Sequence, residues 1–131
     1  MIIDTSAVVA ILAGELERER FLAALGAADA CRMSAASLLE TGIVLDSRAN
    51  PALARGADQL IGIFGVQIVP VDEQQARIAR QAYRDYGRGS GHLAQLNFGD
   101  CFSYACAITY DEALLFKGDG FTHTDVRRWH P

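Results

Sequence analysis

The sequence is poor in lysine, proline and cysteine, and it has no apolar run long enough to cross a membrane. Its 131 residues include three prolines and three cysteines, and Lys117 is the single lysine beside eleven arginines. A membrane-spanning helix needs roughly 20 apolar residues, so we expect no membrane segment. The first residues, Met1-Ile2-Ile3-Asp4, contain no basic segment and reach an acid at once. We therefore expect no signal peptide and a cytoplasmic protein.

The cysteines exclude two common ways of holding a small domain together. Cys31, Cys101 and Cys106 are odd in number, and their spacing matches no common zinc pattern. We expect them to be buried as small apolar residues. Because half of the residues are apolar, one domain of this length has enough material for a core without disulfides or a structural metal.

The charge balance limits how the chain can meet nucleic acid. The formal net charge is −4 and the sequence pI is near 5.2, which argues against simple electrostatic coating of a polyanion. A nuclease whose acidic site meets phosphate through metal cations remains compatible with this balance. The excess of arginine over lysine suits bidentate phosphate contacts.

Short apolar runs alternate with helical patterns along the chain. This alternation predicts an α/β fold with helices on both faces of a parallel sheet. A long helix is expected to open near Ser34 and to end at Pro51, and Asp72 with Gln75 forms a capping-box pattern at the start of a later helix. The expected strands are residues 1–3, 30–34, 66–71, 113–116 and, at an edge, 124–129.

Several motifs of phosphate and acyl chemistry are missing. No phosphate-binding P-loop, no dinucleotide-binding glycine pattern and no serine nucleophile elbow occur, and the three histidines show no paired ligand spacing. The glycine-rich segment GRGSGH, residues 87–92, follows a helix rather than a strand. We interpret it as a loop, and Arg88 within it is a candidate contact for phosphate groups.

Acidic residues fall where the strands of the predicted sheet end. Asp4 ends the first strand, Asp100 lies in the first turn of a helix, and Asp119 follows the strand at 113–116. Glu40 lies further into its helix, from which a long side chain can reach back. Ligands of open parallel sheets bind at this edge, so we expect the four carboxylates to gather there.

Each acid also has a purely structural interpretation. Asp4 can cap the next helix, Glu40 can complete a capping box with Ser37, and Asp100 suits any helix N-terminus. Asp119 stands between two glycines and can simply belong to a turn. Together, however, four carboxylates at one edge repel one another unless a cation, a proton or water separates them. Oxygen-only clusters select hard ions such as Mg²⁺ or Mn²⁺.

Four blocks of the sequence resemble a known family. MIIDTSAVVAIL, SAASLLETGIVL, LNFGDCFSYACA and LLFKGDGFTHTDV are similar, in order and spacing, to the four blocks of PIN-domain toxins of the VapC type. The resemblance implies a single PIN domain over residues 1–131. It also implies a PIN-like three-layer α/β/α sandwich around a five-stranded parallel sheet.

The same resemblance implies an activity and a set of partners. The activity is that of a Mg²⁺- or Mn²⁺-dependent endoribonuclease, the toxin of a type II toxin–antitoxin pair, which hydrolyses RNA phosphodiester bonds. The implied partners are the RNA substrate, a small cognate VapB-type antitoxin and a second copy of the chain in a homodimer. Operator DNA is implied only through the antitoxin.

The resemblance also assigns site residues. Thr5 or Ser6 matches the hydroxyl that supports the first acid, and Asn97 matches a polar position before the third. Many relatives carry a second acid where this chain has Gly120, so the number of metal ions, one or two, stays open. The four catalytic and metal-binding acids of the family are matched by Asp4, Glu40, Asp100 and Asp119.

Two other classes of function compete with this interpretation. A non-catalytic PIN-like binding scaffold would share the fold, but the presence of all four acids argues against a decayed site. A receiver domain needs an adjacent acidic pair near the first strand, where Asp4 stands alone. A phosphatase of the haloacid-dehalogenase type needs a second aspartate two residues later, where this chain has Ser6.

Overall fold

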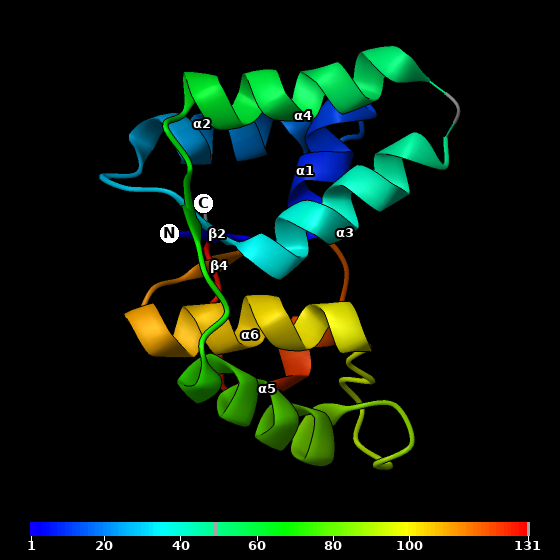
Figure 1. Ribbon diagram of the computed structural model, residues 1–131, viewed down its shortest axis with the longest axis vertical. Helices are drawn as coiled ribbons and strands as arrows, with labels where there is room; N and C mark the ends of the chain where they lie inside the picture. Colours follow the sequence, from blue (N-terminus) through cyan, green and yellow to red (C-terminus); the bar gives the residue numbers. More distant parts are fainter. Residues whose placement is uncertain (49, 131) are drawn as a thin grey trace.

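The computed structural model describes residues 1–48 and 50–130. Ala49, which falls inside the helix predicted between Ser34 and Pro51, and Pro131, the last residue of the predicted domain, lie outside the described residues. The elements follow the chain in the order shown in Figure 1: β1 (Ile2–Ile3), α1 (Thr5–Leu12), α2 (Arg18–Ala27), β2 (Arg32–Ser34), α3 (Ala35–Asp46), α4 (Pro51–Ile63), β3 (Gln67–Val69), α5 (Glu73–Tyr86), α6 (Phe98–Tyr110), β4 (Leu114–Leu115) and the 3₁₀ helix η1 (Gly120–His123).

The strands form a parallel sheet, as predicted, but with four strands rather than five. The strand order is β3-β2-β1-β4, and every pairing between neighbours is parallel. The predicted edge strand at 124–129 is reduced to a single parallel bridge between Leu114 and Arg128. Around that bridge, the Leu114 amide donates to the carbonyl of Arg127 and the Trp129 amide donates to the carbonyl of Leu114. The chain therefore lies beside β4 without extending the sheet by a full strand.

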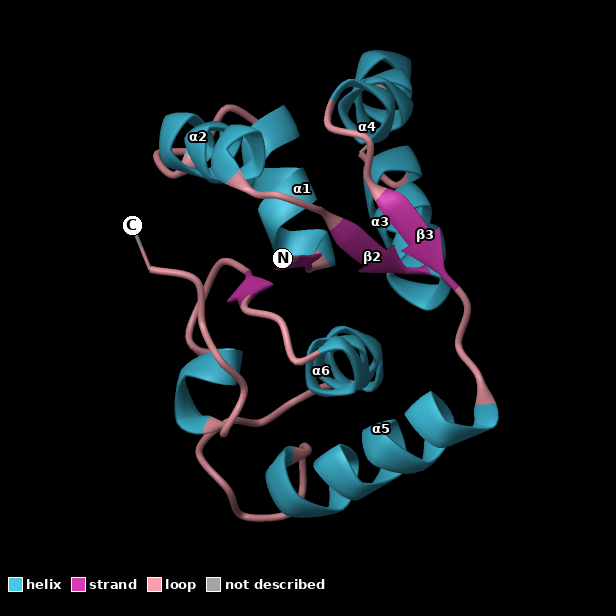
Figure 2. Ribbon diagram, turned by 90° about the vertical axis from the view of Figure 1, so that its left-hand side faces the viewer, coloured by secondary structure: helices cyan, strands magenta, loops and turns pink. Residues whose placement is uncertain are grey.

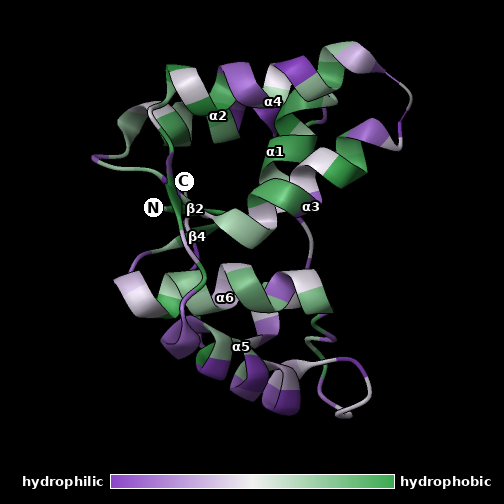
Figure 3. Ribbon diagram, in the orientation of Figure 1, coloured by the Kyte–Doolittle hydropathy of each residue, from purple (hydrophilic) through white to green (hydrophobic). Residues whose placement is uncertain are grey.

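Helices cover both faces of this sheet, which confirms the three-layer architecture. Helices α1 to α4 lie on one face, and α5 and α6 lie on the other (Figures 1 and 2). Each face has its own apolar cluster, the first centred on residues such as Ile3, Ile11 and Leu45 and the second on Ile2, Ala105 and Leu114. Adjacent residues of β1 point to opposite faces, as the pleat requires. Figure 3 shows the contrast between apolar α1 and the hydrophilic outer side of α5.

The helix starts follow local capping chemistry, with one correction. Asp72 accepts a hydrogen bond from the Gln75 amide at 2.8 Å, but the Gln75 side chain donates to the carbonyl of Pro70, so the predicted capping box is only half formed. The prediction that Pro51 ends the helix opened at Ser34 is wrong, because α3 already stops at Asp46. Pro51 instead begins α4, where its fixed φ and missing amide hydrogen fit the first helical position.

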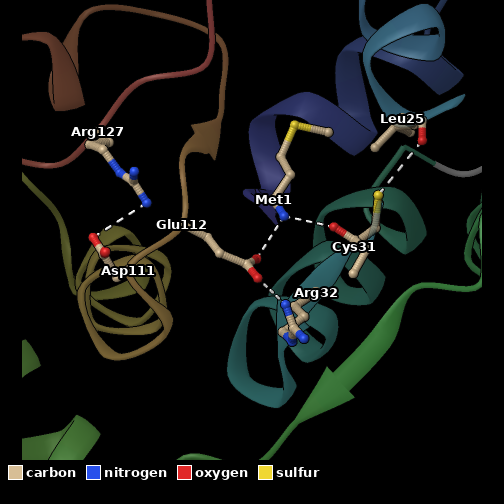
Figure 4. A network of polar contacts seen from close by, with 8 residues as sticks. Met1, Leu25, Cys31, Arg32, Asp111, Glu112 and Arg127 are labelled. Carbon is tan, nitrogen blue, oxygen red and sulfur yellow. Dashed lines mark hydrogen bonds and ion pairs between the residues drawn. The ribbon is translucent and has the colours of Figure 1, made fainter. Parts of the chain in front are cut away.

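The amino ends of the strands meet in a network of opposite charges (Figure 4). The amino group of Met1 donates to a carboxylate oxygen of Glu112 at 2.6 Å and to the carbonyl of Ala30 at 2.7 Å. Arg32 donates to the other oxygen of the same carboxylate. The three elements that begin at this edge, β1, β2 and β4, are thereby tied together.

The expectation that the cysteines are buried is confirmed. Cys31, Cys101 and Cys106 are free and buried, and burial raises the pKa of all three thiols, that of Cys101 to about 11. Among residues 1–48 and 50–130, no helix has the length and apolar character needed to span a bilayer.

Candidate active site

The candidate site lies at the opposite edge of the sheet, where the strands end and the next helices begin. Asp4 follows β1 directly, Glu40 lies in α3 after β2, and Asp100 lies in the first turn of α6. Parallel pairing of β1 with both β2 and β4 puts the ends of all three strands at this edge. The topology therefore gathers residues that are far apart in the sequence.

Asp4 is the most buried acid of the site, with 3% of its surface exposed. It caps α1, and its Oδ2 accepts from the amide and the hydroxyl of Ser6 at 2.9 and 2.5 Å. Its Oδ1 is buried and has no hydrogen-bond donor among the described residues. The structural interpretation of Asp4 as a cap thus holds, but it uses only one of the two oxygens. Burying a carboxylate oxygen without a hydrogen-bond partner costs free energy. A ligand that bound Oδ1 would remove this cost.

Ser6 has a second role at this edge. Its hydroxyl oxygen accepts from the amide of Lys117, just beyond β4, at 2.9 Å. The Ser6 hydroxyl therefore joins the two strand ends on either side of the site, and Asp4 is held by the same group. Of the two hydroxyls considered from the sequence, Ser6 supports Asp4 directly.

Thr5, the other hydroxyl, supports Glu40 instead. Its Oγ1 donates to Oε2 of Glu40 at 2.7 Å, and Thr41 donates to Thr5 at 3.3 Å from behind. The predicted capping box between Ser37 and Glu40 does not form, because Ser34 caps α3. Glu40 is thus freed from helix capping, and its carboxyl group meets the first residue of α1.

The electrostatic surroundings of Glu40 raise the pKa of its carboxyl group. Burial raises the pKa of its carboxyl, the hydrogen bond from Thr5 lowers it in part, and the nearby charge of Asp4 raises it further. The net pKa is above the ordinary value. Glu40 and Asp4 are therefore close enough for their charges to act on each other.

Asp100 is fixed by a reciprocal capping box with Asn97. The Asp100 amide donates to the side-chain oxygen of Asn97 at 2.8 Å, and the Asn97 amide donates to Oδ2 of Asp100 at 2.7 Å. Burial raises the pKa of Asp100 to about 6; the Asn97 hydrogen bond and Arg88 lower it, while the charges of Asp4 and Glu40 raise it. Three carboxylates thus share one neighbourhood, and none of them has an ion-pair partner among the described residues.

Asp119 differs from the other three acids. It lies in the exposed turn between β4 and η1, and its side chain caps nothing. Its backbone carbonyl accepts from the Thr122 amide at 2.9 Å, while Gly118 takes the left-handed φ of +99° that lets the chain turn. No hydrogen bond or ion pair in the described residues joins Asp119 to the other acids. The structure brings together Asp4, Glu40 and Asp100 and leaves Asp119 at the margin.

The donor set fits a hard divalent cation in its chemistry. All candidate ligands are oxygens, the preference of Mg²⁺ and Mn²⁺, and a cation would satisfy the unpaired Oδ1 of Asp4 and relieve the repulsion felt by Asp100. In their present positions, no three acidic, histidine or cysteine side chains of the described residues converge on one point as a ready ligand set. Glu40 and Asp100 each have an oxygen engaged in a hydrogen bond within the protein.

The surroundings of the acids are partly basic and partly apolar. Arg88 is exposed, acts on Asp100 through its charge, and has its backbone amide fixed by the Leu96 carbonyl at 2.9 Å. On the other side, a hollow of about 380 Å³ is bordered by Glu40 and by apolar residues of α3 and α6. Phe98 at its rim is 77% exposed.

Sequence reasoning did not identify two residues that shape this site. Thr41 is buried and supports Thr5. In the sequence, the one signal for Thr41 was its position directly after Glu40. Gly99 lies directly before Asp100, and its missing side chain leaves room for the carboxyl group of Glu40. A glycine inside a predicted helix was the available signal.

Comparison with known proteins places the chain in a family. The PIN-domain family profile matches residues 1–127. This chain is a PIN-domain protein of the VapC type. It is 56% identical over 128 residues to Ribonuclease VapC28 of Mycobacterium tuberculosis, covering 98% of this chain and 96% of that protein. With Ribonuclease VapC42 of the same species it shares 50% identity over 127 residues, covering 97% of each.

Solved structures support the same fold. The crystal structure of Mycobacterium tuberculosis VapC20, described as a sarcin-ricin loop cleaving toxin, matches this PIN domain with a TM-score of 0.76. The match covers 99% of this chain and 98% of VapC20 at 19% sequence identity. FitAB bound to a DNA fragment matches with a TM-score of 0.70 at 22% identity, covering 98% of this chain and 94% of that one. At these identities the likeness concerns the fold.

Proposed function

We propose that this VapC-type PIN domain is the endoribonuclease toxin of a type II toxin–antitoxin pair and hydrolyses RNA with Mg²⁺ or Mn²⁺. The observation that carries the proposal is the gathering of Asp4, Glu40 and Asp100 without an ion-pair partner among the described residues, where one buried Asp4 oxygen also has no hydrogen-bond partner. Relatives named ribonucleases, at 56% and 50% identity over almost the whole chain, support the substrate class.

Each acid has a distinct role in this proposal. Asp4 and Asp100 hold the principal cation, and Glu40 and Asp119 complete the pocket, directly or through water. When bound, the metal ion polarises the scissile phosphate and lowers the pKa of water. With Gly120 in place of a second acid, we propose one tightly held ion, with Asp119 contributing from the exposed margin of the pocket.

The hydrogen bonds around the acids orient them for this task. Ser6 fixes Oδ2 of Asp4 so that Oδ1 faces the site, and Asn97 fixes Asp100 in the first turn of α6. Thr5 holds Glu40 in the same region. Arg88, anchored through its backbone at the base of the glycine-rich loop, would contact a flanking phosphate by its guanidinium group.

We further propose a VapB-type antitoxin and a second copy of the chain as partners, in the cytoplasm. Large apolar side chains gather on α3 and at the start of α6: Leu39 is 66% exposed, Ile43 60% and Phe98 77%. Apolar side chains grouped in this way are typical of protein contact surfaces. Operator DNA would be bound only through the antitoxin.

The test of the proposed function is cleavage of purified cellular RNA by the antitoxin-free chain. We expect cleavage with Mg²⁺ or Mn²⁺, none with excess EDTA, and recovery when the metal is restored, with 5′-phosphate ends on the fragments. Cleavage that continues at full rate in EDTA would refute the metal mechanism. An intact, folded chain that leaves RNA uncut under all these conditions, and that is harmless when expressed without antitoxin, would favour the non-catalytic scaffold instead.

A further inference from the structure

Gly99 packs against the carboxyl group of Glu40. A Cβ atom built on Gly99 would lie 2.6 Å from Cδ of Glu40 and 2.8 Å from Oε2, and closer still to Oε1. Real Cβ atoms essentially never come this close to another heavy atom. The three nearest atoms all belong to this one carboxyl group, and none belongs to the backbone. The end of the Glu40 side chain therefore occupies the place that any other residue at position 99 would need.

The backbone does not explain why this position is a glycine. Gly99 lies in the first turn of α6, and it is absent from the residues with positive φ. Within helices glycine is among the least favourable residues, and alanine is the most favourable. Local structure alone would therefore favour a residue with a side chain here, and the space taken by Glu40 is the remaining physical reason.

The other side of the Glu40 carboxyl group is held by hydroxyls. Thr5 donates to Oε2 at 2.7 Å, and the hydroxyl oxygen of buried Thr41 lies 3.3 Å from that of Thr5 and 2.8 Å from the carbonyl oxygen of Ser37. Glu40 is thus held between a hydroxyl after β1 and the bare first turn of α6. The carboxyl group of Glu40 therefore lies next to Gly99, the residue that precedes Asp100.

We propose that Gly99 is a positioning residue for the reaction: its missing side chain seats the Glu40 carboxylate against the first turn of α6, beside Asp100. The inference rests on the proposed function for its kinetic consequence, but the seat itself is a property of the folded chain. Because the overlapping group is the far end of a flexible side chain, Gly99→Ala displaces Glu40 without preventing folding.

The experiment compares Gly99→Ala with Gly62→Ala. Gly62 is also helical, in α4, and a Cβ there meets no atom within 4 Å. We expect both variants to melt at or above the temperature of the parent chain, since alanine favours the helix. We expect Gly99→Ala to lower kcat for RNA cleavage at least about 10-fold with little change in KM, as lost orientation in the reacting complex predicts. Gly62→Ala should cleave like the parent.

A shortened acid separates displacement from general damage. Glu40→Asp removes one methylene and should lower cleavage in the parent background. In the Gly99→Ala background the shorter side chain of Glu40→Asp relieves the overlap with the new methyl group. The same change should therefore reduce cleavage clearly less there, or restore it. A double-mutant cycle measures this coupling between the two positions. Strictly multiplicative effects of the two substitutions would overturn the inference.

A structural readout keeps the result independent of catalysis. The ¹³C signal of the Glu40 side-chain carboxyl, assigned by its loss in Glu40→Gln, should move in Gly99→Ala and stay in place in Gly62→Ala. An unmoved signal together with unchanged cleavage would overturn the role of Gly99. A parent chain that does not cut RNA would refute the proposed function, while the carboxyl signal would still decide whether Gly99 seats Glu40.

Discussion

The acids at the two edges of the sheet lie in opposite electrostatic environments. At the amino ends of the strands, Glu112 lies between the Met1 amino group and Arg32 (Figure 4). Burial alone raises the pKa of Glu112, but these two positive partners outweigh it, and the pKa lies below the ordinary value. At the carboxyl ends, burial raises the pKa of Asp100 to about 6, and the acids Asp4 and Glu40 add to the rise.

The difference teaches how to separate structural from functional acids in this fold. Each carboxylate oxygen of Glu112 is paired with a positively charged group of the protein, so its charge is balanced without a ligand. Asp4, Glu40 and Asp100 have hydrogen-bond donors but no ion-pair partner among the described residues, and Arg88 only partly offsets the raised pKa of Asp100. Groups with perturbed pKa values cluster at functional sites, and in the proposed function the partner of these acids is a divalent cation.

The largest expected effect is the loss of RNA cleavage when an acid at the carboxyl ends of the strands is replaced. Asp4→Asn should lower RNA cleavage at least about 100-fold, because loss of even an outer partner of a metal site typically costs about 10- to 100-fold. Asparagine still accepts the hydrogen bonds from Ser6, so the fold should survive. The initial rate of cleavage measures the effect.

Glu112→Gln is the matched control. It should leave the rate of cleavage nearly unchanged but reduce the free energy of unfolding by about 1–3 kcal/mol, as expected for a charged hydrogen-bond partner that is lost. Urea unfolding measures this. If Glu112→Gln removed activity at unchanged stability, the division between the two edges would be wrong.

A smaller effect is expected at the margin of the site. Asp119 is exposed and held by no side-chain contact among the described residues, so Asp119→Asn should reduce cleavage roughly 10-fold, as for an outer position of a metal site. Its effect should lie clearly below that of Asp4→Asn in the same assay. Equal losses would mean that Asp119 moves inward and acts as a full ligand when RNA is bound.

The smallest effect concerns stability and pH in the absence of metal. The folded pKa of Asp100 exceeds its usual 3.8, so protonation favours folding, and this stability is lost as pH rises through about 6. The rise corresponds to roughly 3 kcal/mol before solvent screening; for this partly exposed carboxyl we expect about 1 kcal/mol.

Thermal unfolding in EDTA at pH 5 and pH 7.5 tests this expectation. The parent chain should be more stable at pH 5, and Asp100→Asn should show a smaller difference. The lowered pKa of Glu112 affects stability in the opposite direction. Its contribution to the stability of the fold is lost only as the pH falls below the ordinary pKa of this group, near 4.5. A parent chain that becomes steadily more stable from pH 5 to 7.5 would contradict the unbalanced charge at the site.

Local chemistry made much of this structure predictable from the sequence. The cap formed by Asp4, the start of α6 near Gly99 and the parallel sheet all follow from residues close in the chain or from alternation of elements. Capping works over three residues, so a sequence shows it directly. The same patterns explain why Asp4 and Asp100 were placed at one edge.

Long-range contacts were not predictable in this way. The contact between Thr5 and Glu40 spans 35 positions, and the pairing of Arg32 with Glu112 spans 80. The choice of Ser34 over Ser37 as the cap of α3 depends on where β2 ends. The reduction of the predicted fifth strand to a single bridge likewise depends on how residues 127–129 pack beside β4. These features are decided by packing between elements, which no local pattern contains.

The most direct test of the central claim is the rate of RNA cleavage by the purified chain and by Asp100→Asn, with saturating Mn²⁺ and matched melting curves. Asparagine can still accept the hydrogen bond from the Asn97 amide, so both proteins should fold. The account predicts that the parent cleaves RNA and that Asp100→Asn, folded to the same extent, loses at least about 100-fold in rate. A folded Asp100→Asn variant that cleaves RNA like the parent would contradict it.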